Sequence, residues 1–261
     1  MWRSRRRDVQ RLVRRHPPET SRQVGGGRVS ATERQTDSRS SGRSGWRVRW
    51  CGDAALVVEC DADLDPRVNA RAVEIARQVR LARVEGVRDV VPTHSAVTVY
   101  LDPVAGDAEV LSRRLLSWAE SSAPAAEAQR EITVGVRYGG PGGPDLEAVA
   151  AFAGCSIDEV VRRHAAGHYR VFMLGFLPGF AYMGVVDSRI AMPRRATPRL
   201  AVPARSVGIA GRQTGIYPSA APGGWQLIGT ADIAPFTLQA EPACIFRAGD
   251  LVRFEPRVVE S

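Results

Sequence analysis

The chain has 261 residues, of which 44% are hydrophobic and 25% charged, as expected for a globular protein of one large or two modest domains. Its formal net charge is +8. Residues 1–45 hold twelve of the 36 arginines and four of the 28 acids, which leaves 24 of each in the remainder. Because the basic excess belongs to this tail, the folded part gives no indication of a nucleic-acid partner.

Every basic residue other than histidine is arginine, since the sequence contains no lysine. This excludes a phosphate loop that ends in Gly-Lys, a pyridoxal Schiff base and a biotin-carrying lysine. It excludes a kinase-type catalytic lysine as well. If the protein handles phosphate, arginine side chains and backbone amides must bind it.

Residues 1–45 are rich in Arg, Ser and Gly and poor in apolar residues, so we predict that they are disordered. No apolar stretch follows their arginines, and no export signal is expected. An RNA- or membrane-surface arm and a dispensable extension are the two interpretations of this tail.

Two further features bear on location. The uncharged run at 171–186 has sixteen residues, fewer than the ~18 to 20 that span a bilayer, and glycines and a proline interrupt it. We therefore expect no membrane anchor.

The four cysteines are scattered without metal-ligand spacing, which favours a reduced, cytoplasmic protein without a metal site.

Residues 46–122 are predicted to form a small α+β domain. Two strands around a Gly52–Asp53 turn come first, followed by a helix that Asp65 caps and Gly86 ends. Two strands broken at Pro92 and a second helix complete the domain, with the helices on one face of a sheet. The predicted buried stripe of the first helix is Val68, Ala72, Ile75, Val79 and Ala82.

Residues 130–261 are predicted to form a mainly β domain after a linker at 121–129. Two short helices come early, one starting near Asp145 and one with a capping box of Ser156 and Glu159. Beyond Tyr169, Gly and Pro recur between short Val, Ile and Leu runs, which is typical of a β-barrel or sandwich with functional loops.

Four segments are candidates for chemistry: "LGFLPGFAYMG", "MPRRATPRLAVP", "IAGRQTGIYP" and "APGGWQLIG". Their glycines allow close backbone approach, and prolines such as Pro178 make the loops rigid. The predicted walls of an apolar pocket are Phe176, Phe180, Tyr182, Tyr217 and Trp225. Arg194, Arg199 and Gln213 are predicted to orient a small anion there. On spacing alone, a plain barrel core with its turns is the favoured interpretation of these residues.

These segments, in this order, resemble the family of 5-oxoprolinase B subunits, which also contains KipI and the allophanate hydrolase subunit 1 domain. "GDAALVVEC", "RYGGPGGPDLEAVA", "PRRATPR" and "GRQTGIYPSAAPGGW" carry the resemblance from about Val48 onward. It implies an α+β N-terminal domain followed by a cyclophilin-like β-barrel. In that fold "GFLPGFAY" is expected to be a rigid aromatic loop at the barrel mouth.

The resemblance also implies ATP-dependent opening of 5-oxo-L-proline to L-glutamate. ATP is then the co-substrate of a complex in which the C component of a 5-oxoprolinase, or a protein like it, and an A component take part. Arg194, Arg199 and Gln213 are expected to bind carboxylate or phosphoryl oxygens, with Tyr217 orienting the ring; salt bridges to neighbouring acids are the alternative for the arginines. His164 is expected to cap its helix, His168 to lie on the surface and His94 to be structural.

Two departures from the family pattern stand out. Arg205 lies where the family usually has glycine, and we expect it to strain a turn or crowd the site. The Arg that usually falls between Gly229 and Thr230 is absent, which would weaken activity if that side chain handles phosphate.

Two other functions remain open. One is a KipI-like inhibitor of a sensor histidine kinase. The other is a carboxyltransferase-like component of a biotin-dependent amide carboxylase, acting on biotin that a partner carries.

Overall fold

The computed structural model describes residues 45–105, 107–121 and 130–257. The predicted disordered tail (except Gly45) and most of the predicted linker lie outside the described residues. No helix among the described residues is long and apolar enough to cross a membrane.

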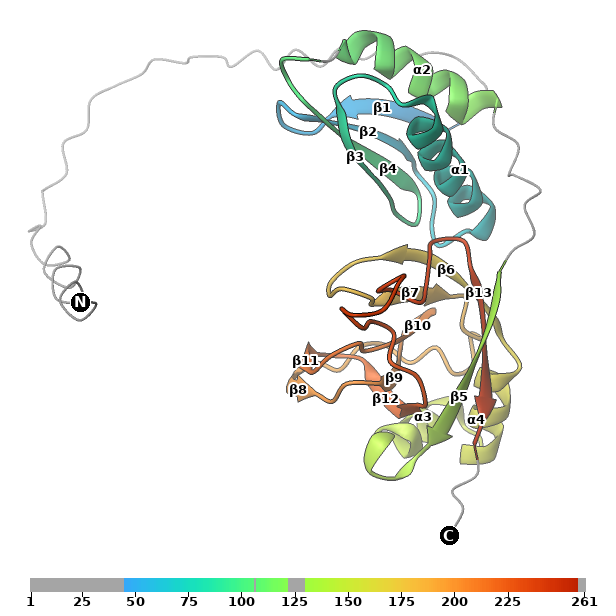
Figure 1. The fold of residues 1–261 in the computed structure, drawn as a ribbon. Helices are drawn as coiled ribbons and strands as arrows, with labels where there is room; N and C mark the ends of the chain where they lie inside the picture. Colours follow the sequence, from blue (N-terminus) through green and yellow to red (C-terminus); the bar gives the residue numbers. More distant parts are fainter. Residues whose placement is uncertain (1–44, 106, 122–129, 258–261) are drawn as a thin grey trace, which may run out of the picture. The chain divides into compact units, whose positions relative to one another are not determined.

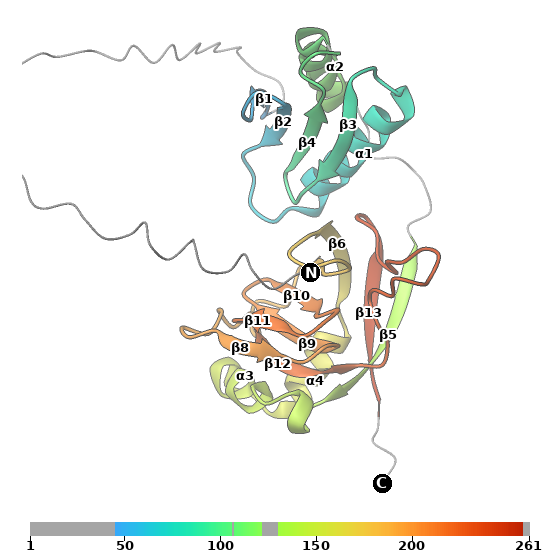
Figure 2. The ribbon, with the colours of Figure 1, turned by 60° about the vertical axis from the view of Figure 1, so that its left-hand side comes forward.

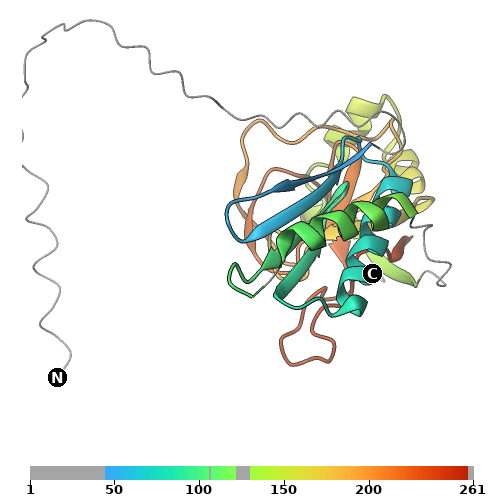
Figure 3. The same cartoon turned by 90° about the horizontal axis from the view of Figure 1, so that it is seen from above.

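Residues 46–121 form a four-stranded antiparallel sheet with two helices on one face (Figures 1 and 3). The elements are β1 (Trp46–Trp50), β2 (Ala55–Cys60), α1 (Pro66–Ala82), β3 (Val87–Pro92), β4 (Ala96–Leu101) and α2 (Ala108–Ser121). The strand order is β1-β2-β4-β3. Alternate residues of the strands, such as Leu56 and Val58, point toward the helices and are buried.

Helix α1 begins as its sequence predicts and ends earlier. The Asp65 carboxylate accepts a hydrogen bond from the Arg67 backbone N–H at 2.7 Å, and Pro66 opens the helix. The end is at Ala82, because Arg83 adopts the left-handed conformation (φ 45°) before Gly86 is reached. Ala82 is exposed, so its predicted place in the buried stripe is wrong; Ala76 is buried instead.

Residues 130–257 form a closed seven-stranded barrel with the strand order β10-β7-β6-β13-β5-β12-β9 (Figure 2). The barrel strands are β5 (Glu131–Tyr138), β6 (His168–Leu174), β7 (Ala181–Gly184), β9 (Ser206–Ala210), β10 (Gln213–Ile216), β12 (Gln226–Ala231) and β13 (Leu251–Pro256). This closed barrel confirms the mainly β character of the C-terminal half. Strand β13 pairs parallel to β5, while the other pairings are antiparallel.

Three short helical elements and a ribbon complete the barrel. They are η1 (Gly140–Gly142), α3 (Leu146–Ala153), α4 (Ile157–Ala165) and the pair β8 (Arg199–Val202) and β11 (Ala221–Gly223). Helices α3 and α4 pack on each other and on β12 and β13 respectively. The ribbon forms a separate sheet and extends to one side of the barrel (Figure 2).

Candidate functional site

The loop between β6 and β7 is shaped by its glycines. At Gly179 φ is +83°, and a Cβ there would lie 2.5 Å from the Cβ of Phe236, so both conformation and space require glycine. Hydrogen bonds from Leu177 N to the Gly175 carbonyl (2.8 Å) and from Phe180 N to the Leu177 carbonyl (3.0 Å) close the turn. The loop thereby buries Phe180 and leaves Phe176 57% exposed.

A hollow of about 230 Å³ opens beside this loop. Its lining residues come from the loop, from β7, from the segment before the ribbon, from the turn after β10, and from β11 and the turn that follows it. They are Phe176, Phe180, Tyr182, Arg194, Pro198, Tyr217, Pro222, Gly223, Gly224 and Trp225. We call it the aromatic hollow. Phe180 connects the aromatic residues of the lining: its buried ring meets Tyr182, Tyr217 and Trp225 edge to face, with 4.9–5.4 Å between centroids.

Arg194 is the charged residue among those lining the aromatic hollow. Its guanidinium carbon lies 5.9 Å from the centre of the Trp225 ring, which is within reach of a cation–π interaction. Tyr217 supplies a neutral hydroxyl: burial raises the pKa of its phenol, although a hydrogen bond from the Trp225 backbone N–H and the charge of Arg194 act in the opposite direction. The Arg194 cation and the Tyr217 hydroxyl thus lie beside an apolar, aromatic wall.

Six of the nine predicted site residues line this hollow, and three do not. Pro178 lies within the β6–β7 loop but not among the lining residues. Gln213 starts β10 and borders a different hollow with Met173 and Arg212. Arg199 starts β8 and forms an ion pair with Asp145 at 2.7 Å. For Arg199 the structure thus shows a salt bridge to an acid, the alternative to anion binding.

Asp145 is a residue whose role the sequence did not reveal. It is buried, and its Oδ1 accepts from Arg195 (3.0 Å) and Arg199 (2.7 Å). Its Oδ2 accepts from the Leu227 backbone N–H at 2.7 Å. The position before α3 resembles an N-cap, yet the side chain makes no capping bond because these three donors occupy it.

Asp145 helps to fasten the segment that carries Arg194. Residue 195 is held by the ion pair to Asp145 and by a hydrogen bond from its backbone N–H to the Gly224 carbonyl (2.8 Å). Residue 193 is held by a hydrogen bond from the Gln226 side chain to its carbonyl (2.9 Å). Arg194 therefore projects from a segment that is fixed on both sides, which limits the entropy lost on binding a ligand.

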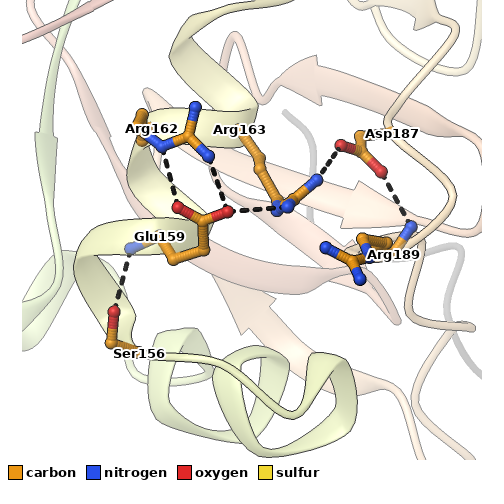
Figure 4. Close-up of polar contacts among 6 residues, drawn as sticks. All are labelled: Ser156, Glu159, Arg162, Arg163, Asp187 and Arg189. Atoms are coloured by element: carbon orange, nitrogen blue, oxygen red, sulfur yellow. Dashed lines mark hydrogen bonds and ion pairs between the residues drawn. The ribbon is translucent and has the colours of Figure 1, made fainter.

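A second network ties α4 to the loop that precedes this segment (Figure 4). The Glu159 carboxylate accepts both guanidinium contacts from Arg162, at 2.7 and 2.6 Å. Arg163 bridges Glu159 and Asp187, each at 2.7 Å. Ser156 accepts from the Glu159 N–H at 3.2 Å, which confirms half of the predicted capping box. The Glu159 side chain forms the ion pairs in place of the other half.

The histidine predictions have mixed outcomes. His164 is fully buried, and its ring contacts the Tyr138 hydroxyl (2.7 Å) and the Thr214 hydroxyl (2.9 Å). The predicted capping role is wrong, because the ring points into the barrel interior. His168 is exposed at the start of β6, as predicted, and His94 lies exposed in the turn between β3 and β4.

The two departures from the family pattern, Arg205 and the absent Arg before Thr230, lie outside the aromatic hollow. Arg205 has φ +66°, which confirms the expected strain, but it is exposed and does not line the hollow. Gly229 and Thr230 pair with β5, and the Thr230 side chain fills the space above Gly142, where no Cβ would fit. The missing Arg therefore does not remove a side chain from the hollow's lining.

Comparisons with known proteins place the chain in a family. A model described as the carboxyltransferase domain, subdomain C and D, matches residues 46–246. The 5-oxoprolinase B subunit of Escherichia coli O157:H7 is 41% identical over 206 residues, which cover 79% of this chain and 94% of that protein. The 5-oxoprolinase B subunit of Bacillus subtilis is 37% identical over 220 residues, covering 80% and 92%.

Solved structures agree with this placement. The structure of TTHA0988 has a TM-score of 0.70 and 34% identity over 81% of this chain, but only 40% of its own chain is covered. The present chain therefore spans two fifths of that protein. The urea carboxylase of Kluyveromyces lactis has a TM-score of 0.67 and 17% identity, and the match covers 82% of this chain and 22% of the urea carboxylase chain. At this identity the likeness shows the fold alone. The family model and the curated relatives together show that the chain belongs to the family of 5-oxoprolinase B subunits.

Proposed function

We propose that this protein is the B component of an ATP-dependent 5-oxoprolinase, a cytoplasmic complex that opens 5-oxo-L-proline to L-glutamate. Two relatives that bear this name, 41% and 37% identical and covered over more than nine tenths of their length, support the proposal. The partners are a protein like the C component and an A component. The longer chain of TTHA0988, of which this chain matches 40%, is consistent with further components.

The single observation in the structure that supports the substrate is the aromatic hollow with Arg194 at its edge. Its volume of about 230 Å³ is below the range of sites for drug-sized ligands and suits a small ring. In this proposal Arg194 binds the carboxylate of 5-oxoproline. The lactam ring lies against Phe180 and Trp225, and the protonated Tyr217 donates a hydrogen bond to the lactam carbonyl oxygen.

The proposed chemistry follows from the low reactivity of a lactam. ATP transfers its γ-phosphoryl group to the carbonyl oxygen, with ADP leaving, so that this oxygen becomes a leaving group and the ring carbon becomes electrophilic. Water then attacks that carbon and the C–N bond opens with protonation of the nitrogen, which leaves an acyl phosphate on the former ring carbon. A second water hydrolyses this acyl phosphate to the carboxylate of glutamate and free phosphate. The residues of this chain bind and orient the ring while that occurs; no residue of the chain is assigned to ATP.

The two alternative functions are weaker. Three curated relatives, at 37–41% identity, carry the 5-oxoprolinase name, and none of these three is named as a kinase inhibitor or a carboxylase. The urea carboxylase resembles this chain at 17% identity, which extends to the fold and not to the reaction.

The test is ATP hydrolysis by the full-length chain co-purified with its C-component partner and supplemented with the A component. We expect 5-oxo-L-proline to stimulate phosphate release, with one glutamate formed per ATP consumed. A stable complex that hydrolyses ATP at the same rate with and without 5-oxo-L-proline would exclude the proposed function.

A further inference from the structure

Phe176 is a bulky residue in a backbone conformation that favours glycine. Its φ is +69°, a region that costs free energy for any residue with a Cβ and is an outlier for an aromatic one. Among the described residues two other non-glycine residues, Arg83 and Arg205, have positive φ. Both are exposed in a helix end and a turn, whereas Phe176 lines the aromatic hollow.

The packing of Phe176 within the chain does not account for this conformation. Its side chain is 57% exposed, and its ring meets Phe180 and Tyr217 edge to face, with centroids 5.5 and 6.4 Å away. The neighbours in the loop supply the packing, because Phe180 is buried and Leu177 packs against the same cluster. A glycine at 176 would form this turn without strain.

Strain of this kind is retained where a side chain is needed in one direction. The ring of Phe176 is the exposed aromatic ring of the hollow's lining, edge to face with the buried rings of Phe180 and Tyr217. None of the described residues that line the hollow is acidic, so the charge of Arg194 is not neutralised by the lining. A ligand that fills the space is therefore flat on the side that faces Phe176 and carries a negative charge toward Arg194.

We propose that Phe176 is a specificity-determining residue: its ring forms the outer wall of the site and selects a compact, flat carboxylate ring over an acyclic carboxylate with the same groups. The inference rests on the proposed function for the identity of the ring, a lactam carboxylate. The ring of Phe176 gains contact with the planar amide of a lactam, and an acyclic amide leaves part of that face uncovered.

The experiment is calorimetric titration of the full-length chain in complex with its C-component partner. The two ligands are 5-oxo-L-proline and N-acetylglycine, which has the same amide and carboxylate without the ring. The variants are Phe176→Ala and Phe176→Gly, which both remove the ring while only the second relieves the strain. Leu200→Ala, at a 93% exposed apolar residue of β8, is the matched control.

We expect both Phe176 variants to lose about tenfold in affinity for 5-oxo-L-proline, with N-acetylglycine affected by less than about twofold. Leu200→Ala leaves both affinities unchanged. The Gly variant melts about 2–4 °C above the Ala variant, because the strain is relieved.

The inference alone would be overturned by a wild-type preference for the ring that both variants keep, or by a Gly variant that melts no higher than the Ala variant. Loss of both affinities in the Leu200 control would also overturn it, because the selection would not be local to Phe176. If the wild-type complex has no affinity for 5-oxo-L-proline, the proposed function itself fails, and the inference with it.

Discussion

Lowering the pH from 7 to 5 should destabilise this protein through one buried histidine. Burial lowers the pKa of His164 from its ordinary value of 6.5 to about 3. The Thr214 hydroxyl donates to the Gly208 carbonyl at 2.9 Å. It must therefore accept from His164 Nε2–H, and Nδ1 accepts from the Tyr138 hydroxyl. The ring is neutral in the native state, and protonation would disrupt this chain of hydrogen bonds.

The sign and size of the effect follow from proton linkage. Below pH 6.5 the unfolded chain binds a proton at His164 that the native state does not, so the free energy of unfolding falls as the pH falls. With native and unfolded values of about 3 and 6.5, the loss between pH 7 and pH 5 is about 2 kcal/mol. Carboxylates whose pKa is lowered by arginine, such as Glu159, titrate below this window.

Urea unfolding of wild type and His164→Gln at pH 5, 6 and 7 tests this assignment. The Gln variant keeps a donor toward Thr214 and cannot be protonated, so we expect its free energy of unfolding to fall by about 2 kcal/mol less over the window than that of the wild type. Its own stability at pH 7 does not matter, because only the two slopes are compared. Equal slopes would refute the assignment of a neutral native His164.

Three further substitutions test features of the fold. Arg205→Gly should raise the free energy of unfolding by about 1 kcal/mol by relieving a left-handed residue, and a fall in urea unfolding would contradict the strain. Gly179→Ala should lower the free energy of unfolding by about 2–3 kcal/mol, because the positive φ and the contact with Phe236 both oppose a methyl group. Gly211→Ala, at a positive φ with open space around it, should lower it by about 1 kcal/mol, and equal losses would contradict the close contact at Gly179. Asp145→Asn should cost about 2–3 kcal/mol because it leaves two arginines without their buried partner. Glu109→Gln, in an exposed pair, should cost under about 0.5 kcal/mol, and a similar loss for both would show that burial is not decisive.

The elements of this chain were accessible to sequence reasoning where local chemistry decides them. The start of α1 follows from Asp65 and Pro66, and the capping contact at Ser156 follows from its own side chain. The end of α1 was not accessible, because Arg83 terminates the helix in a conformation that a non-glycine residue rarely adopts. Its position depends on how the chain must turn into β3.

The site was predictable as a set of residue types and not as a set of contacts. Aromatic residues and Arg194 from distant segments do meet at one hollow. No local pattern pairs Asp145 with Arg199, 54 residues away, or His164 with Thr214, 50 residues away. Such pairs are decided by how the barrel closes and how the β8–β11 ribbon packs beside it, which local patterns do not encode. For Asp145, the sequence signal is an acidic residue directly before a short helix in a Gly/Pro-rich segment. Such an acid is a candidate partner for a distant arginine.

The most direct test of the proposed site is the kcat/KM for 5-oxo-L-proline of the complex with Arg194→Met. Loss of a charge-assisted bond to the carboxylate should lower kcat/KM by about 10- to 100-fold. Arg189→Met, at an exposed arginine of the preceding loop, is the matched control and should leave it within about twofold. An Arg194 variant with wild-type kcat/KM, or an equal loss in both variants, would contradict the assignment of the aromatic hollow as the substrate site.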